Sequence, residues 1–205
     1  GIETMERLLP GVPQVAVFDT AFHSRMPLEK VVYPGPYVWY EQDIKRYGFH
    51  GTSHQYCAER SAQILGQNLN SLRIINCHLG NGCSVAAIQH GHSIDTSMGF
   101  TPTEGLMMGT RTGSIDPSIL VYLQREQHTT ADQLDQILNK QSGFLGISGV
   151  SNDLRQVEKA AAEGNERAKL AISMFIYRLR FFIGAMVASL GGVDVLTFTA
   201  GVGEH

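Results

Sequence analysis

The sequence predicts an α/β chain in which strands lead into glycine turns and then into helices. Short apolar runs rich in β-branched residues occur at 72–77 and 193–199, and a glycine turn follows each run. From residue 116 onward, apolar residues recur at helical spacing instead. Glycine contributes 22 of the 205 residues without a fixed period, so we expect the excess where the backbone bends or approaches another group closely.

The N-terminal half is expected to hold two helices and most of the strands. A helix is predicted over residues 2–9, and a strand over 14–18 that begins after Pro13. Thr52 followed by Gln55 matches a capping box, which would open a helix that ends near residue 65. The strand at 72–77 is expected to be buried, with antiparallel partners at 83–89 and 93–96 joined by a turn at 90–92.

The C-terminal half is predicted to be mainly helical. Pro117 occupies a first-turn position of one helix. Further helices are expected at 130–140, 153–162 and 165–190, and the glycine pair at 191–192 ends the last of them. A strand at 193–199 and a turn at 201–203 follow. We expect the apolar helix 165–190 to belong to the core, with a subunit interface as the alternative.

Composition argues against several classes of protein. The chain is 43% hydrophobic and 17% charged, which is typical of a folded globular protein. The net charge of -3 and the lack of a basic block argue against a nucleic-acid groove. The longest uncharged apolar run, 181–193, is too short to cross a bilayer, so no membrane association is expected.

Compartment and completeness follow from simple features of the sequence. The three cysteines are irregularly spaced and form no disulfide framework, and no signal peptide opens the chain. A cytoplasmic location is therefore expected. Because the first residue is Gly1 and the chain opens within a helix, we expect it to be part of a longer protein.

The first candidate for ligand binding is the strand-end loop HLGNGC (78–83). Small residues directly after an apolar strand allow consecutive backbone N–H groups to face one point, which can bind phosphate. Asn-Gly is also the strongest hairpin dipeptide, so a plain hairpin turn is the alternative. A second glycine turn, TAGVGE (199–204), follows another apolar strand, and the two together suggest a nucleotide between them. Neither turn matches the Walker A or dinucleotide pattern.

Charged side chains supply further candidates. Arg111 lies between Gly109 and Gly113, where a guanidinium could reach into a cleft and grip phosphate oxygens; an ion pair with Asp116 is the alternative. Asp19 follows a predicted strand, a common position for an acid that faces an active site, although a capping or turn aspartate is more frequent.

Two further segments are candidates, one for a metal site and one for contact with a sugar or base. His50, His54 and Cys57 lie close together, but the glutamate of a helical zinc motif is missing, which leaves a metal-dependent hydrolase built on Asp19, His50 and His54 as the weakest alternative. We expect His54 in the first turn of its helix and His50 just before it. The segment 152–155 opens a helix whose polar start could contact a sugar or base, and Asn152 or Ser151 is the expected cap.

Six stretches of the chain form a set: VFDTAFH (17–23), YGFHGTSH (47–54), CHLGNG (77–82), DTSMGFTPTEGLMMGTRTGSIDP (95–117), SGVSNDLR (148–155) and FTAGVGEH (198–205). Together they resemble the acetate kinase (acetokinase) family across essentially the whole chain, and the block around Arg111 is highly specific. The resemblance implies an actin-like ATPase (ribonuclease H-like) fold, with mixed sheets flanked by helices and incomplete at both ends. It further implies that residues 1–20 hold the end of an N-terminal domain region and the crossover, and that 21–205 hold most of a truncated C-terminal nucleotide-binding domain.

The resemblance also implies an activity. Family members transfer the γ-phosphoryl group of ATP directly and reversibly to acetate, which gives acetyl phosphate and ADP and requires Mg²⁺ (or Mn²⁺), and they are expected to form homodimers. A propionate or butyrate kinase is the first alternative. A non-catalytic nucleotide-binding or chaperone-like ATPase module of the same fold is the second, although it would have no reason to keep a carboxylate clamp at Arg111.

Site residues follow from the resemblance position by position. It assigns Arg111 to the transferring phosphoryl group and the carboxylate, His50 to a donor in the transition state, and Asp19 to an essential acid near metal and phosphate. The residues implied for the other parts of the site are His78, Asn81 and Gly82 for the ATP phosphates, Asp153, Leu154, Arg155, Gly201 and Val202 for adenosine, and Phe49 and Pro102 for part of the acetate methyl pocket. Metal ligands are expected outside this chain, together with an asparagine, an arginine and a glutamate of the family's site. The chain also departs from the family at its end, where it stops at His205 and the family continues with asparagine. Because these parts of the site are missing, we expect these 205 residues alone to be inactive.

Overall fold

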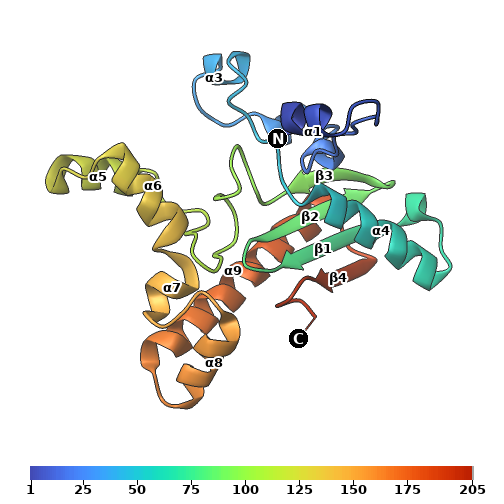
Figure 1. Ribbon diagram of the computed structural model, residues 1–205. Coiled ribbons are helices and arrows are strands. Elements are labelled where there is room, and N and C mark those ends of the chain that lie inside the picture. Colours follow the sequence, from blue (N-terminus) through green and yellow to red (C-terminus); the bar gives the residue numbers. More distant parts are fainter. Residues whose placement is uncertain (205) are drawn as a thin grey trace.

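The computed structural model describes residues 1–204 and is organised around one four-stranded mixed sheet (Figure 1). The strand order is β3-β2-β1-β4, with bounds β1 Arg73–Leu79, β2 Cys83–Gln89, β3 His92–Thr96 and β4 Val195–Thr199. β1, β2 and β3 form an antiparallel meander, and β4 pairs parallel to β1 at the other edge. The antiparallel partners predicted for the 72–77 strand are therefore confirmed.

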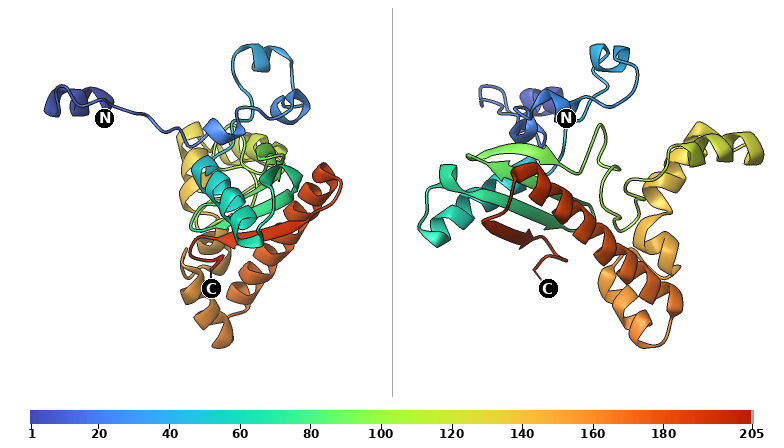
Figure 2. Two further views of the ribbon diagram at one scale, coloured as in Figure 1. Left: turned by 90° about the vertical axis from the view of Figure 1, so that its right-hand side faces the viewer. Right: turned by 180° about the vertical axis from the view of Figure 1, so that it is seen from behind.

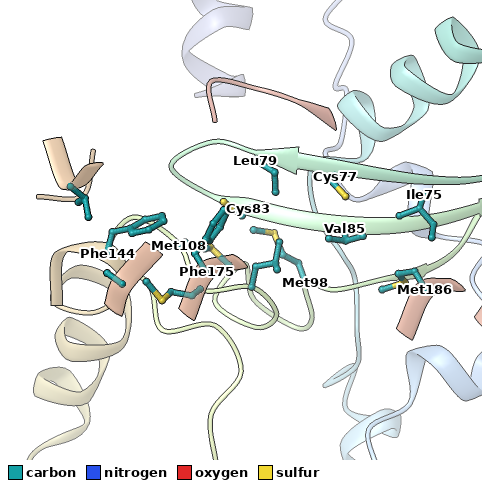
Figure 3. Close-up of a cluster of buried hydrophobic side chains, with 14 of the residues drawn as sticks. Ile75, Cys77, Leu79, Cys83, Val85, Met98, Met108, Phe144, Phe175 and Met186 are labelled. Atoms are coloured by element: carbon teal, nitrogen blue, oxygen red, sulfur yellow. The ribbon is translucent and has the colours of Figure 1, made fainter. Parts of the chain in front are cut away.

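Two helices cover opposite faces of the sheet, α4 (Gly51–Leu65) and α9 (Glu166–Leu190) (Figure 2). Successive side chains of a strand point to opposite faces, so each strand contributes to both layers. The α9 layer is the main core, and the buried side chains that β1 and β2 contribute to it are apolar; Figure 3 labels Ile75, Cys77, Leu79, Cys83, Val85, Phe175 and Met186 within it. A smaller apolar cluster under α4 contains Ala58, Ala62, Leu72, Ile74 and Ile88.

The sheet face under α4 changes character along its length. Beneath the last turns of α4 it is apolar, with Ile74 and Ile88 packed against the helix. Beneath the first turn it carries Asn76, His78 and Ser84, of which Asn76 and Ser84 are fully buried. Buried polar groups are costly unless they are hydrogen-bonded, and every buried side-chain nitrogen and oxygen in residues 1–204 has a partner.

The remaining helices lie around this layered body, and two regions extend away from it. α1 and α5 bury no residue, and α5 with α6 projects from the sheet (Figure 1), while α7 and α8 pack against α9. Their bounds are α1 Ile2–Leu8, α2 Leu28–Val31, α3 Val38–Glu41, α5 Ser118–Gln127, α6 Ala131–Lys140, α7 Gly143–Ser148 and α8 Leu154–Ala162, with 3-10 turns η1 Ala21–His23 and η2 Leu69–Ser71.

Several local predictions need correction. The predicted strand at 14–18 does not form, and Val17 is 77% exposed, because no described strand lies beside this segment to complete a ladder. The capping box at Thr52 does not form: the N-cap is His50, two residues earlier, and α4 begins at Gly51. Pro117 stands just before α5 rather than in its first turn. Asp153, not Asn152 or Ser151, caps α8, and α7 was not predicted.

Helix α9 is buried on one side only. Ala168, Ala171, Phe175, Met186 and Leu190 face the core, so the core prediction holds for this stripe. On the other side Tyr177 is 63% and Phe181 53% exposed. Within residues 1–204, α9 is also the one helix long and apolar enough to cross a membrane, a test that core helices of soluble proteins pass as well.

Candidate active site

Asp19 fixes the start of helix α4 from a distant part of the chain. Its Oδ2 accepts a hydrogen bond from the backbone N–H of His50 at 2.7 Å, and its carbonyl oxygen accepts from Gly51 at 2.8 Å. His50 has a left-handed backbone with φ of 58°, and a Cβ atom on Gly51 would collide with the Asp19 carbonyl. The backbone of α4 thus begins where Asp19 holds it, and this sets the position of the His50 ring.

His50 and Arg111 converge on the tip of the β1–β2 hairpin. A Cβ atom placed on Gly82 would lie 3.6 Å from His50 Nε2 and 3.4 Å from Arg111 Nη1, so Gly82 lies within contact distance of both side chains. Arg111 Nη1 donates to the carbonyl oxygen of Pro102 at 3.4 Å. Within residues 1–204 the Arg111 guanidinium forms no ion pair, so the alternative pairing with Asp116 is wrong.

Backbone hydrogen bonds fix the position of the loop that carries Arg111. The Met108 N–H donates to the Arg111 carbonyl at 3.1 Å, and the Met108 carbonyl accepts from Phe144 at 2.9 Å. The Thr112 N–H donates to the Leu138 carbonyl at 3.1 Å. These bonds attach the loop to α6 and α7, which gives a non-helical segment a defined position.

His78 lies against His50. Their ring centroids are 4.0 Å apart with the planes inclined by 28°, and His78 Nδ1 lies 2.8 Å from Ser53 Oγ. Burial, and secondarily the neighbouring His78, lowers the pKa of His50 to about 4. Burial also lowers the pKa of His78. At neutral pH His50 is therefore uncharged, and it can act as a hydrogen-bond donor or acceptor but not as a cation.

A cavity of about 580 Å³ opens on the other side of the hairpin tip. It is lined by the tip itself, by α7, by the start of α8 and by the turn after β4: Gly80, Asn81, Phe144, Asn152, Asp153, Leu154, Arg155, Glu158, Gly201 and Val202. All five residues predicted to bind adenosine are among them. Its volume lies within the roughly 300–1,000 Å³ typical of small-molecule sites.

Asn81 connects the two sides of the tip. Its carbonyl oxygen accepts from the Gly109 N–H at 3.1 Å, and its Oδ1 accepts from Asn152 Nδ2 at 3.0 Å. A Cβ atom on Gly109 would collide with the Asn81 side-chain oxygen. The hairpin tip, the Arg111 loop and the start of α8 are therefore in mutual contact. The loop 78–83 is both a hairpin turn and part of the cavity wall, so its two interpretations are compatible.

The start of α8 is held by an aspartate. Asp153 Oδ1 accepts from the Arg155 N–H at 3.0 Å, and Arg155 Nη2 donates to Asp153 Oδ2 at 2.6 Å. Hydrogen bonding by Arg155 lowers the pKa of Asp153. The pair sits at the cavity rim with the Arg155 side chain 86% exposed, so solvent screens the ion pair and it adds little stability.

The predicted methyl-pocket residues are less closely defined. Phe49 packs against the main core, and its carbonyl oxygen lies 3.0 Å from His23 Nε2. Pro102 reaches the site through its carbonyl contact with Arg111. Their role stays a prediction.

The described residues do not form a metal site by themselves. Residues 1–204 contain no group of three or more His, Cys, Asp or Glu side chains placed to hold a metal ion. Asp19 is the one acidic side chain hydrogen-bonded to the predicted catalytic residues. Magnesium commonly takes only one or two carboxylates together with substrate phosphates, so Asp19 alone would be an incomplete set of ligands.

Sequence reasoning missed several residues of this region. Phe144 and Glu158 line the cavity, Ser53 bonds to the ring of His78, and Ser84 bonds to the rings of both His50 and His54. Only the helical spacing of 153–162 could have indicated Glu158, which lies one turn after Leu154. The ring partners come from α4 and β2, and no local pattern relates these two elements.

Comparisons with known proteins agree with this architecture. The model of the Acetokinase family matches residues 1–205. The chain is 65% identical to an acetate kinase of Cyanothece sp. and 66% identical to one of Gloeobacter violaceus, covering 100% of this chain and 50% and 51% of those proteins. The chain thus spans about half the length of the curated relatives it matches.

Solved structures resemble the fold closely. The structure of Porphyromonas gingivalis acetate kinase matches with a TM-score of 0.96 and 50% identity, over 100% of this chain and 52% of that chain. A propionate kinase from Francisella tularensis matches with a TM-score of 0.94 and 46% identity, over 100% of this chain and 53% of that chain. The predicted fold class is confirmed by these two likenesses and by the mixed sheet flanked by helices.

Proposed function

Because the chain belongs to the Acetokinase family, we propose that in the full-length protein it transfers the γ-phosphoryl group of ATP reversibly to acetate. The products are acetyl phosphate and ADP. The observation that supports this most is the shared hairpin tip: Gly80 and Asn81 line the cavity, whereas the next residue, Gly82, lies beside His50 and Arg111. A nucleotide site and a cationic, donor-rich site thus meet within three residues.

The proposed reaction is a direct in-line displacement. A carboxylate oxygen of acetate forms a bond to the γ-phosphorus, and the bond from that phosphorus to the bridging oxygen breaks, so that its electron pair leaves with ADP. Acetate is already ionised at pH 7, so the acceptor needs no general base. The site has to align acceptor and phosphate and to neutralise charge on the equatorial oxygens.

The residues of this chain divide that work. Arg111 supplies a permanent positive charge and several donors, which suits both a phosphoryl group and a carboxylate. His50, neutral at pH 7, contributes a hydrogen bond, and the backbone of the hairpin tip contributes N–H donors. The adenosine occupies the cavity, where Phe144, Leu154 and Val202 offer apolar surface and the start of α8 offers polar groups.

The proposal includes a divalent cation, Mg²⁺ or Mn²⁺, which when bound would neutralise phosphate charge. Asp19, which is hydrogen-bonded to His50, would supply one carboxylate ligand to the cation. The other ligands would come from the nucleotide and from the rest of the full-length protein.

We also propose a cytoplasmic homodimer. The exposed apolar side of α9, including Tyr177 and Phe181, is the surface of this chain best suited to a subunit contact. Sedimentation of the full-length protein would test this, and a monomer at micromolar concentration would contradict it.

Propionate is a second candidate for the phosphoryl acceptor, because the propionate kinase from Francisella tularensis shares the fold at a TM-score of 0.94. Hydroxamate formation from ATP with acetate, propionate and butyrate, measured on the full-length protein, separates these possibilities. We expect the highest kcat/KM with acetate. A preference for propionate or butyrate would move the assignment to those kinases, and ATP hydrolysis indifferent to any carboxylate would favour a nucleotide-binding module.

A further inference from the structure

Resting on the proposed function, we propose that a series of buried and partly buried hydrogen bonds through Asn76, His54 and Ser84 fixes the tautomer of His50. This series of hydrogen bonds, which we call the relay, starts at Thr197 on β4 and ends at His50 Nδ1. Its effect is that His50 carries its proton on Nε2, the ring nitrogen beside Gly82 and Arg111. Asn76, His54 and Ser84 would then be positioning residues that act through His50.

The direction of the relay is set at its first bond. Thr197 Oγ1 lies 2.6 Å from Asn76 Oδ1, and its other neighbour, the Ile75 carbonyl oxygen, is 3.5 Å away. A separation of 2.6 Å is typical of O–H···O bonds and shorter than the usual N–H···O bond. The amide oxygen of Asn76 therefore accepts from the Thr197 hydroxyl, and the amide nitrogen faces the other way, toward His54.

The second bond determines the tautomer of His54. His54 is fully buried, and its Nδ1 lies 2.7 Å from Asn76 Nδ2. An amide nitrogen can only donate, so His54 Nδ1 has to be the unprotonated nitrogen. Burial lowers the pKa of His54 well below its ordinary value, so the ring is neutral and its single proton is on Nε2.

The third and fourth bonds carry this polarity to His50. His54 Nε2 lies 2.7 Å from Ser84 Oγ, which accepts the His54 proton. The hydroxyl has one proton of its own, and the remaining partner of Ser84 Oγ is His50 Nδ1 at 2.9 Å. Ser84 therefore donates to His50 Nδ1, and the proton of the neutral His50 ring is left on Nε2.

The consequence for the reaction is the sign of the contact at the phosphoryl group. A neutral imidazole with its proton on Nε2 offers a donor to an anionic oxygen, whereas the other tautomer would offer a lone pair and repel it. Asn76, His54 and Ser84 are fully buried and lie outside the cavity, so none of them has to touch a substrate to exert this effect.

The test uses ring ¹⁵N NMR on the full-length protein at pH 7, with the His50 signals assigned by their loss in His50→Gln. We expect His50 Nδ1 to be unprotonated and Nε2 protonated in the parent. In Ser84→Ala we expect a mixture of tautomers and a roughly 10- to 100-fold lower kcat. This is the range of loss when a hydrogen-bond partner that orients a metal-binding histidine is removed. Ser84→Thr, which keeps the hydroxyl, should retain the parent tautomer.

Ser93→Ala is the matched control. Ser93 is equally buried on the neighbouring strand, but its Oγ bonds to His23 Nδ1, at 2.7 Å, and not to His50. This variant should leave the His50 tautomer unchanged. The relay is overturned if His50 Nδ1 carries the proton in the parent, a result that needs no variant to fold, or if Ser84→Ala keeps the parent tautomer. A parent protein without kinase activity would reject the proposed function and leave the NMR result to decide the relay.

Discussion

The two sides of the β1–β2 hairpin tip are built in different ways. On the side of His50 and Arg111, side chains are held by partly buried hydrogen bonds and by a loop that is bonded to α6 and α7. On the cavity side, the wall is made of backbone turns, apolar side chains and an exposed ion pair. The first side therefore fixes the orientation of the groups proposed to act on the phosphoryl group, whereas the second side offers a surface that fits the shape of a nucleotide. Substitutions on the first side should lower kcat, and those on the second should raise KM for ATP.

Removing the charge at Arg111 should lower kcat more than any other substitution on the side of His50 and Arg111. In the full-length protein we expect Arg111→Ala to lower kcat by about two orders of magnitude or more, because a transition-state charge partner is lost. Arg125→Ala, an exposed arginine on α5, is the control and should be silent. Near-normal turnover of Arg111→Ala in a hydroxamate assay would refute the assigned role.

A single methyl group at Gly109 should disturb both sides together. Its Cβ would displace the Asn81 side chain, which joins the hairpin tip to the start of α8. We expect kcat/KM for ATP to fall roughly tenfold, equivalent to about 1.4 kcal/mol. The matched control is Gly184→Ala in α9, where a Cβ meets nothing within 4 Å and should stabilise the helix by about 0.5–1 kcal/mol. Equal kinetics in the two variants would show that Asn81 has no part in binding.

Shortening Leu154 should affect the cavity side alone. The side chain is half-buried at the cavity wall, so Leu154→Ala should raise KM for ATP several-fold, by roughly 1 kcal/mol of lost apolar contact. kcat at saturating ATP should be unchanged. Leu28→Ala, an exposed leucine on α2, serves as the control. A fall in kcat without a change in KM would mean that the two sides are not separable.

The smallest expected effect is that of pH on His50. Burial lowers its pKa to about 4, so between pH 8 and pH 5 the ring should stay neutral, and an NMR titration should show no midpoint near 6.5. Because the unfolded chain takes up this proton near pH 6.5, the free energy of unfolding should fall as the pH drops from about 6.5 toward 4. A midpoint near 6.5 would show that the ring is not held as described.

The strong local patterns of the sequence predicted most elements. The meander formed by β1, β2 and β3 follows from the apolar runs at 72–77 and 83–89, from the short segment 93–96 and from the turn at His90 and Gly91. The end of α9 at Gly191 and the start of α6 after Thr130 are equally local. The division of the chain at residue 20 is tested by none of these observations and stays a prediction.

What could not be predicted depends on contacts between distant residues. Asp19 meets the start of α4 across 31 positions, so the helix begins at Gly51 rather than at the local Thr52 signal. The apolar stretch at 14–18 has strand composition, but a strand also requires a neighbour. In the site, alternation along β1 places Asn76 and His78 on one face, yet only the fold brings His54 and Ser84 against them.

The parallel pairing of β4 with β1 has a consequence for how the chain folds. Asn76 lies opposite Thr197, so this pairing closes a loop of 121 residues, whereas the meander closes turns of a few residues. Contacts of such sequence separation form slowly because their chain entropy must be lost before they contribute stability. The meander should therefore form early and β4 should join last. Since Thr197 orients Asn76, the polarity of the His50 ring is settled only in that final step of folding.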